Sequence, residues 1–431
     1  MKTKKYILES TKYFIRSYPF IKKYINEIED LYQLNEIDLR ERNEKSFLKL
    51  FQEAYDKSQF YHQLYVSSGI RKEDIQSISD LSKLPIVTKE MIRENANKIL
   101  IKPQFLVKSA CTSGSTGTPL KIYESLHTIW KEQAYTYCAR KRNGFTFGQP
   151  LVSLRGNLDK RITHLKVHLN NTLYLSSYNI NSSTIFLYYQ LINEHAPKAI
   201  EGYPSSLYSL ALFCKEAKIK LNIPITFTSS ETLLDFQREL IESQLNTEIF
   251  DNYGMTEKAV YLQEDHRHNG YYELPGYSIN EYHKDGLICT SLINDSFPLI
   301  RYQTGDIASL TEQPSGHPLN IVQRIEGRKD DVIICKDGTQ IQQLSFILKG
   351  INNVKCTQMI QDENGFLNIR IVPDAGFEES DKNHIEQNVK NRIGGNNIDF
   401  IISIISEKDI IYTKRGKFKY LINKRDSYKR L

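Results

Sequence analysis

The sequence predicts an α/β protein, with a large N-terminal domain of β-sheets flanked by helices and a small α+β domain after it. Three observations support this. Residues 26–100 carry helical patterns, residues 150–310 alternate short apolar strands with helical stretches, and the pattern changes again near residue 327. Strands that alternate with helices are typical of sheets covered by helices. The predicted domains are therefore 1–327, beginning with a helical segment over about 1–100, and 328–431.

Local patterns predict the individual elements. Phe47, Leu50, Phe51 and Ala54 are spaced as on one face of a helix, and Thr88 stands where a helix N-cap is expected. A strand, a polar turn and a second strand are predicted over 105–123. Further helices are predicted at 125–142, 205–217 and 234–243, and strands at 248–250, 332–335, 369–372 and 400–405.

The composition is that of an ordinary globular protein. Of the 431 residues, 40% are hydrophobic and 25% are charged, which excludes wholesale disorder. No apolar run reaches the ~18 residues that a membrane-spanning helix needs, and the N-terminus has no secretory signal pattern. The six cysteines are far apart, without a CxxC pair, which predicts the reduced thiols of a cytoplasmic protein.

Positive charge is concentrated at the two ends. Residues 1–25 hold seven Lys/Arg against Glu9, and residues 414–430 hold eight against Asp426, so that the middle is acidic although the net charge is +6. This distribution argues against a nucleic-acid partner, which usually meets a basic face. Residues 1–25 are also rich in aromatic and aliphatic side chains. They predict either a helix packed on the body with its lysines in solvent, or a segment that lies on an anionic membrane.

The polar turn before residue 120 is a candidate phosphate loop. Its residues all carry a hydroxyl group or are glycine, and they are Thr112, Ser113, Gly114, Ser115, Thr116, Gly117 and Thr118. Glycine allows backbone N–H groups to converge on an anion, and hydroxyls add donors. The loop lacks the lysine of a Walker motif. A flexible surface loop is the alternative interpretation.

Four further motifs are candidates for nucleotide chemistry. They are Asp251–Glu257 after the strand 248–250, Arg301–Asp306, Gly327–Asp331 and Lys414–Lys419. Polar residues that follow a strand of an open α/β sheet lie at its ligand-binding edge. Taken singly, each motif is also explained by a capped turn or, for the last, by a basic tail.

The order and spacing of all five motifs resemble the adenylate-forming superfamily over nearly the whole chain. The segments Ser58–Tyr65, Asp80–Asn95, Ile200–Leu207 and Thr228–Leu233 look most like its phenylacetate–CoA ligase branch, which includes capsule-biosynthesis relatives. The resemblance implies an adenylate-forming large domain, binding AMP and ATP, and a small mobile C-terminal lid.

The resemblance also implies roles for particular residues. For ATP binding, the resemblance assigns the β- and γ-phosphates to Thr112–Thr118 and the ribose to Asp306 with Arg328. The residues that it places around adenine are Ser230, Glu231, Asn252 and Tyr253. For catalysis the residues are Thr256 on a phosphate, Glu257 with Mg²⁺ and Lys417 between the carboxylate and the α-phosphate, with Asp330 as the hinge.

The implied activity is ATP-dependent conversion of a small carboxylic acid to an acyl-adenylate, followed by transfer of the acyl group to CoA. One alternative is transfer to an amine, sugar or carrier in surface polysaccharide biosynthesis. A second is a degenerate nucleotide-binding scaffold.

Some nearby residues are not assigned to chemistry. His266 and His268 lie where relatives carry a Cys/His segment, but this chain has no cysteine there, so we do not predict zinc. His164 and His168 are expected to be solvated surface side chains, and Arg155 to be structural.

Overall fold

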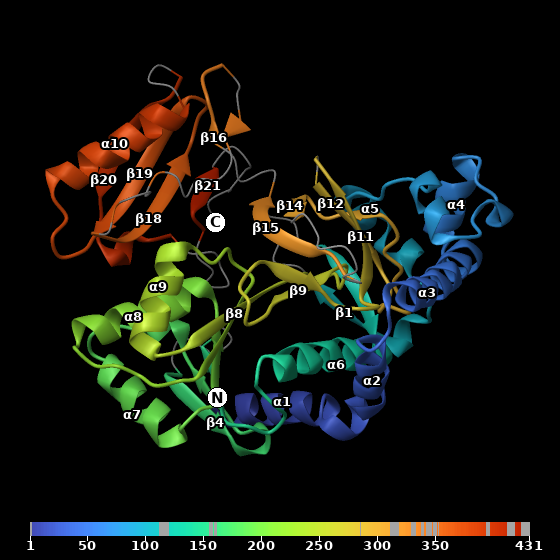
Figure 1. Cartoon of the computed structure of the whole chain (residues 1–431), viewed down its shortest axis with the longest axis horizontal. Coiled ribbons are helices and arrows are strands. Elements are labelled where there is room, and N and C mark those ends of the chain that lie inside the picture. The colour runs from blue at the N-terminus through green and yellow to red at the C-terminus, as the bar shows by residue number, and fades with distance from the viewer. Residues whose placement is uncertain are drawn as a thin grey trace. The chain divides into compact units, whose positions relative to one another are not determined.

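The structure is a computed structural model. It describes residues 2–111, 120–154, 158, 162–284, 286–310, 319–328, 333–337, 340–341, 347, 351, 353–393, 397–411 and 419–423. The chain divides into two compact units, a larger one that runs to Ile325 and a smaller one that starts at Glu326. The predicted α/β class is confirmed, with a large unit of sheets flanked by helices and a small α+β unit (Figure 1).

Helices dominate the first hundred residues. They are α1 (Lys2–Ile15), α2 (Tyr18–Leu31), α3 (Glu36–Lys57), α4 (Gln59–Ser67), α5 (Lys89–Ile99) and the 3₁₀ helices η1 (Lys72–Asp74), η2 (Ile78–Lys83) and η3 (Gln104–Leu106). The predicted stripe from Phe47 to Ala54 is buried on α3. The hydroxyl of Thr88 accepts a hydrogen bond from the N–H of Met91 at 3.3 Å, which confirms the predicted cap of α5.

The largest sheet is parallel at its centre and antiparallel at both edges. Its order is β14 (Asp306–Leu310), β15 (Ile321–Arg328), β10 (Tyr271–Glu273), β9 (Tyr261–Glu264), β8 (Glu248–Gly254), β7 (Ile225–Ser229), β6 (Ala199–Gly202), β3 (Leu151–Leu154), β5 (Thr172–Leu175) and β4 (His164–Val167). Strands β8, β7, β6, β3 and β5 are parallel to one another. Parallel strands direct their carboxyl ends to the same edge, where such sheets bind ligands.

Helices cover both faces of this sheet. Helices α7 (Ile185–His195), α8 (Pro204–Glu216) and α9 (Asp235–Leu245) enclose one apolar core, which includes Ile200 and Ile249 of the strands. On the other face Phe227 and Phe250 form a second cluster, and Arg140 of α6 (Leu126–Arg142) lies over the Phe227 ring. The 3₁₀ helices η4 (His168–Asn170) and η5 (Ser177–Asn179) complete this part.

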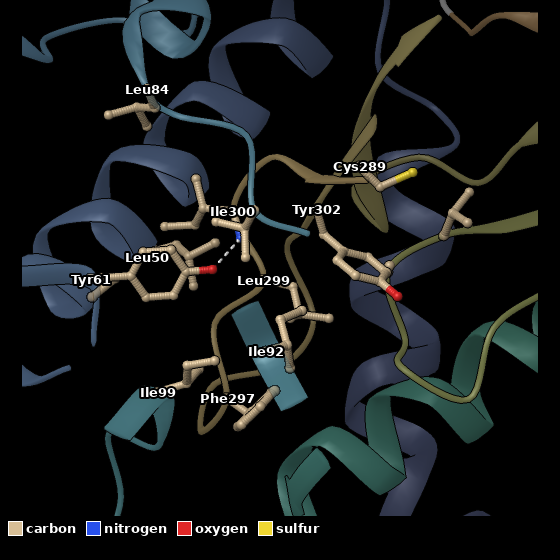
Figure 2. Packing of buried hydrophobic residues seen from close by; sticks show 14 of the residues in the cluster. Leu50, Tyr61, Leu84, Ile92, Ile99, Cys289, Phe297, Leu299, Ile300 and Tyr302 are labelled. Atoms are coloured by element: carbon tan, nitrogen blue, oxygen red, sulfur yellow. Dashed lines mark hydrogen bonds between the residues drawn. The ribbon is translucent and has the colours of Figure 1, made fainter. Parts of the chain in front are cut away.

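Two smaller sheets pack with the N-terminal helices within the large unit. They are β1 (Val107–Cys111) with β2 (Lys121–Ser125), and β11 (Ser278–His283) with β12 (Gly286–Ser291) and β13 (Tyr302–Gln303). Figure 2 shows the core that they share with α3, α4 and α5. There the hydroxyl oxygen of Tyr61 accepts a hydrogen bond from the N–H of Ile300 at 3.0 Å. Val87, which precedes α5, forms a parallel bridge with Tyr302.

The small unit is a helix packed on a sheet. The sheet has the order β20 (Asp399–Ile404), β19 (Phe366–Pro373), β18 (Val354–Gln361) and β21 (Leu421–Asn423). Helix α10 (Glu379–Ile393), the hairpin of β16 (Ile333–Ile334) and β17 (Gln340–Ile341), and η7 (Glu407–Asp409) complete the described part. Ile385 and Val389 of α10 pack on Leu367 and Ile369 of β19, so the unit has a core of its own.

Two predicted turns prove to be strand. Strand β8 was expected to end at Phe250 but continues through Gly254, because Asn252 pairs with Ser229 of β7 and Gly254 with Tyr261 of β9. The expected turn at Gly327–Arg328 is the end of β15. Separately, none of the helices in the described ranges combines the length and apolar character that crossing a bilayer requires.

Candidate functional site

The candidate site lies at the carboxyl edge of β7 and β8. Ser229 and Asn252 are paired in register at the ends of these parallel strands. The side-chain amide of Asn252 donates a hydrogen bond to the carbonyl of Thr228 at 2.9 Å, which fixes its orientation. Ser230, directly after β7, is exposed and has a φ of +70°, a left-handed conformation that is uncommon for serine. Such conformations are concentrated at functional sites.

Glu231 connects this edge to a neighbouring helix. Its carboxylate accepts a hydrogen bond from the backbone N–H of Ser205 at 3.1 Å, in the first turn of α8. A carboxylate at a helix N-terminus is favoured because it meets unpaired N–H groups and the positive end of the helix dipole. The contact holds the Ser229–Glu231 segment against the start of α8.

Tyr253 and Asp306 join two of the sequence motifs. The hydroxyl of Tyr253, near the end of β8, donates a hydrogen bond to the carboxylate of Asp306, at the start of β14. Burial, together with the adjacent Asp306 carboxylate, raises the pKa of Tyr253 well above its ordinary value, so that the phenol remains a donor. The backbone N–H of Asp306 donates a hydrogen bond to the hydroxyl oxygen of Thr304 at 3.1 Å, which holds the backbone of Asp306 in place. Gly305, with a φ of +81°, allows the sharp turn between them.

Glu257 and Thr256 follow β8. Glu257 is 4% exposed, and its carboxylate accepts a hydrogen bond of 3.4 Å from the hydroxyl of Tyr302, which is fully buried. Thr256 is exposed. The next residue, Lys258, forms an ion pair of 3.2 Å with Glu132 of α6, which anchors the chain after the motif.

Glu257 is the residue for which the sequence predicts contact with Mg²⁺, and its surroundings allow that prediction to be compared with the structure. Among the described residues, no group of three or more His, Cys, Asp or Glu side chains could hold a metal ion. Mg²⁺ in nucleotide enzymes usually binds one or two carboxylates and completes its octahedron with phosphate oxygens and water. A single buried carboxylate, Glu257, is compatible with that arrangement.

Several predicted site residues lie outside the described residues. These are Lys417, Asp330 and Thr112–Thr118. Arg155, which was expected to be structural, also lies outside them. Arg328 ends β15, and only its backbone is described. Of the remaining predicted residues, Ser230, Glu231, Asn252 and Tyr253 are gathered along one edge, and Tyr253 is joined to Asp306.

Two residues with hydrogen bonds beside the candidate site were not predicted from the sequence. Tyr302 lies inside a recognised motif but was given no role, although its hydroxyl reaches Glu257. The signal was available, because a buried tyrosine usually finds a polar partner. Asp251 is also buried, and it accepts hydrogen bonds from Thr228 at 2.5 Å and Tyr271 at 2.6 Å. Tyr271 lies on β10, so the sequence around Asp251 gives no sign of this contact.

The histidine cluster is separate from the site. His266 and His268 both contact the carboxylate of Glu248, at 2.8 and 3.2 Å, and their rings pack on Phe250. His164 begins β4 and His168 begins η4. All four histidines lie outside β7 and β8, the strands whose carboxyl ends form the candidate site.

A pocket of about 250 Å³ also lies away from this edge. It is lined by residues of α6, β9, β10 and the α2–α3 connection, including Tyr32, Arg142 and Arg267. Arg142 stacks on Tyr32 and bonds Glu29, and Arg267 bonds Asp265. Because both guanidinium groups are engaged within the protein, we assign no ligand to this pocket.

Comparison with solved structures identifies the class of fold. The chain superposes on 2-hydroxyisobutyryl-CoA ligase, captured in the postadenylation state with an acyl-AMP, with a TM-score of 0.73 at 16% identity, covering 91% of both chains. The architecture described above is thus that of the adenylate-forming ligases, as expected from the sequence.

Sequence comparisons show which proteins this chain resembles. Residues 333–424 match the family model of the CapK C-terminal domain. The chain is 25% identical to Protein CapK of Staphylococcus aureus, covering 94% of this chain and 93% of that protein. It is 24% identical to the phenylacetate-coenzyme A ligase of Pseudomonas putida, covering 70% and 74%. In sequence the chain is thus similar to CapK and to phenylacetate-coenzyme A ligases, and in fold it is similar to adenylate-forming ligases.

Proposed function

We propose that this protein uses ATP to convert a carboxylic acid to an acyl-adenylate and then transfers the acyl group to CoA. The observation that carries the proposal is the Tyr253–Asp306 hydrogen bond beside the paired strand ends of β7 and β8. It brings together an aromatic ring and a carboxylate at the edge where α/β sheets bind nucleotides. The similarity to a phenylacetate-coenzyme A ligase supports the same activity.

The nucleoside is assigned to the described edge. The Tyr253 ring offers a planar surface for adenine, and Ser230, Glu231 and Asn252 belong to the same edge of paired strands. Asp306 accepts hydrogen bonds from the ribose hydroxyls with Arg328 alongside, since a carboxylate has lone pairs to spare after bonding Tyr253.

The phosphates are assigned to Thr112–Thr118 and Thr256. Glu257 would hold Mg²⁺, which when bound neutralises charge that develops on the phosphates. Lys417 provides a cation between the carboxylate and the α-phosphate, and Asp330 is the hinge of the small domain.

The chemistry needs no protein nucleophile. A carboxylate oxygen of the substrate attacks the α-phosphorus, the bond to the β-phosphate oxygen breaks, and pyrophosphate leaves. The thiol of CoA then attacks the acyl carbon, loses its proton, and AMP leaves. Adenylation replaces hydroxide, a poor leaving group, with AMP. Lys417 stabilises the charge that develops in the first step.

The first test traps the adenylate with hydroxylamine across a panel of carboxylic acids. We expect hydroxamate and AMP to form with at least one acid, and Lys417→Ala to lower that rate by about 10²–10³-fold. Lys419→Ala, two residues along the same tail, is the matched control and should retain near-normal activity. Normal pyrophosphate exchange in Lys417→Ala would refute the assigned lysine. Absence of ATP consumption with every acid would favour a scaffold.

A second candidate differs only in the acceptor. The similarity to CapK extends over 94% of this chain, against 70% for the phenylacetate ligase. This favours considering an amine, sugar or carrier as the acceptor, in surface polysaccharide biosynthesis. The basic, aromatic N-terminus would suit an acceptor anchored to a membrane. Release of AMP that requires an amine or sugar and is unaffected by CoA would establish this candidate over the first.

A further inference from the structure

The N-terminal helix α1 buries a carboxylate and exposes several large apolar side chains, which is unusual for a surface helix. Its carboxylate Glu9 is 7% exposed and faces inward, where Lys5 and Lys12 each approach it to 3.0 Å. Its exposed positions include large apolar side chains, with exposed fractions of 59% for Ile7 and 60% for Phe14, next to Thr3, Lys4 and Thr11. A surface helix normally buries its apolar stripe and presents charge to water.

The apolar face continues onto the start of α2. We call it the N-terminal apolar face, and it consists of Ile7, Leu8, Phe14, Ile15, Tyr18 and Phe20, all of which are exposed. Phe14 and Phe20 contact each other, with ring centroids 5.6 Å apart, which links the two helices within this face. Large exposed apolar patches mark interaction sites.

The body of the protein holds this face in place. Tyr6 packs on an apolar cluster beside β4, and Tyr13 stacks on Phe147. Phe20 stacks on Trp130 of α6 with ring centroids 5.7 Å apart, and the Trp130 indole N–H donates to the carbonyl of Ile15 at 2.7 Å. Figure 1 shows α1 and α2 beside β4 and α6. The outward direction of the apolar side chains is therefore fixed by packing on the other side of the helices.

Positive charge surrounds the face. Lys4, Lys22 and Lys23 are exposed beside it. Residues 1–25 hold seven cationic side chains and one carboxylate, Glu9, which pairs with Lys5 and Lys12. Lys23 also lies 3.8 Å from the exposed carboxylate of Glu27, so the excess of positive charge rests mainly on the other lysines and arginine. A second copy of the chain docking on the same face would bring two such sets of cations together. The charge thus disfavours self-association and favours an anionic partner.

We propose that α1 and the start of α2 dock this protein on an anionic lipid bilayer. The N-terminal apolar face enters the boundary between headgroups and acyl chains, and Lys4, Lys22 and Lys23 contact the anionic headgroups. Apolar insertion combined with lysine attraction is the recognised physics of interfacial helices. The proposal is independent of the ligase reaction.

Trp130 provides a direct readout, because it is the single tryptophan of the chain and touches Phe20. The experiment adds phosphatidylcholine vesicles, with or without phosphatidylserine, to the full-length protein. We expect a blue shift of the tryptophan emission, and quenching by brominated acyl chains, only with phosphatidylserine. The response should weaken as salt rises from about 0.1 M to about 1 M, because the Debye length falls from about 10 to about 3 Å.

Two variants separate the apolar and electrostatic parts. The double variant Ile7→Ser/Phe14→Ser should bind vesicles at least about tenfold more weakly. Lys22→Glu/Lys23→Glu should weaken binding by at least about fivefold for each lysine. Ile37→Ser/Phe105→Ser removes side chains that are 78% and 85% exposed elsewhere, and should bind as the wild type does. Hydroxamate formation, or the unfolding midpoint if no acid is yet known, verifies that each variant is folded.

Three outcomes would overturn the proposal. They are no binding to phosphatidylserine vesicles, equal binding by Ile7→Ser/Phe14→Ser, and equal loss in the Ile37→Ser/Phe105→Ser control. Concentration-dependent dimerisation that the Ile7→Ser/Phe14→Ser variant abolishes, without any vesicle response, would instead identify a second copy as the occupant.

Discussion

Buried and partly buried carboxylates of the large unit are held in two contrasting ways. Two of them form ion pairs with arginine. Both carboxylate oxygens of Glu281 accept hydrogen bonds from Arg301, and both oxygens of Glu264 accept hydrogen bonds from Arg238. Asp306 accepts a hydrogen bond from the hydroxyl of Tyr253 instead, and Glu257 from that of Tyr302.

The contrast separates structural carboxylates from those available for chemistry. A bidentate guanidinium neutralises a carboxylate and fixes its geometry. A neutral hydroxyl orients a carboxylate without cancelling its charge, which therefore remains available for a ribose hydroxyl or a cation. The arginine-held group Glu281 also links distant segments, because Arg301 donates to the carbonyls of Ser82 and Leu84. The comparison predicts that substitutions at the arginine-bound carboxylates lower stability, whereas substitutions at the tyrosine-bound carboxylates lower activity or nucleotide binding.

The largest expected effect is on stability, from Arg301→Ala. Arg301 is 8% exposed, and its removal leaves the partly buried Glu281 without its guanidinium and two carbonyls without their donor. Breaking a buried ion pair in this way costs about 3–5 kcal/mol. Denaturant unfolding, followed by circular dichroism, measures the change.

The matched control for that variant is Arg267→Ala. Arg267 also bonds a carboxylate through two nitrogens, that of Asp265, but its side chain is 61% exposed. Exposed pairs of this kind contribute less than about 1 kcal/mol. Equal losses for the two arginines would show that burial does not distinguish them, and the contrast would fail.

The next effect is on the pH dependence of stability and concerns Asp251. Its carboxylate accepts hydrogen bonds from hydroxyls, as those of Asp306 and Glu257 do, but it is buried on a strand of the large sheet. Burial raises its pKa above the ordinary value for aspartate, to about 6, against the lowering effect of the hydrogen bonds from Thr228 and Tyr271. An acid whose folded pKa is raised binds its proton more tightly in the folded protein. The free energy of unfolding therefore falls as pH rises from about 4 to about 6.

Asp251→Asn should remove this contribution. The difference in unfolding free energy between wild type and variant should shift by up to about 3 kcal/mol in favour of the variant between pH 4 and pH 7. Urea unfolding at both pH values measures it, and contributions from the other carboxylates cancel in the difference. Parallel pH profiles for the two proteins would contradict the raised pKa.

A third effect is on nucleotide binding, from Asp306→Asn. The amide still accepts from Tyr253 but loses the charge that strengthens bonds to the ribose, so the KM for ATP should rise about 10- to 100-fold. The unfolding free energy should change little. Glu281→Gln is the reciprocal control, with lower stability and a KM for ATP within about twofold of wild type. If Glu281→Gln raised the KM as much as Asp306→Asn, the two kinds of carboxylate would not be distinct.

The sequence predicted most elements whose information is local. The stripe Phe47–Ala54, the Thr88 cap and the helix over 125–142 follow from spacing and residue type within a few positions, and α3, α5 and α6 confirm them. The extension of β8 through Gly254 was missed because it depends on pairing with β7 and β9. Polar residues such as Asn252 resemble a turn until those neighbours are in place.

The site was predicted in its residue types but not in its contacts. Motif resemblance singled out Tyr253, Glu257 and Asp306, whereas the tyrosine–carboxylate bonds join positions 45 and 53 residues apart. Helix α1 shows the same limit. Its composition left a packed helix and a membrane segment open, and only the structure shows the helix packed on the body with Glu9 inward and Ile7 outward.

The smallest expected effect comes from Tyr302→Phe, which removes the hydroxyl that orients Glu257 and keeps the buried ring. A hydrogen bond contributes about 0.5–1.5 kcal/mol net, so kcat for hydroxamate formation should fall about 2- to 10-fold. The Mg²⁺ concentration for half-maximal activity should rise with it, whereas the KM for the acid should not change. A purely structural tyrosine would leave the Mg²⁺ dependence unaltered.

Tyr65→Phe is the control that sharpens this last prediction. Tyr65 is also fully buried in the core shared by α3, α4 and β13, but its hydroxyl has no hydrogen-bond partner in the described part of the chain. Removing an unsatisfied buried hydroxyl should leave stability equal or higher and activity unchanged. If both variants shifted the Mg²⁺ dependence, the effect would come from the core as a whole. A shift confined to Tyr302→Phe would place the oriented carboxylate of Glu257 at the metal.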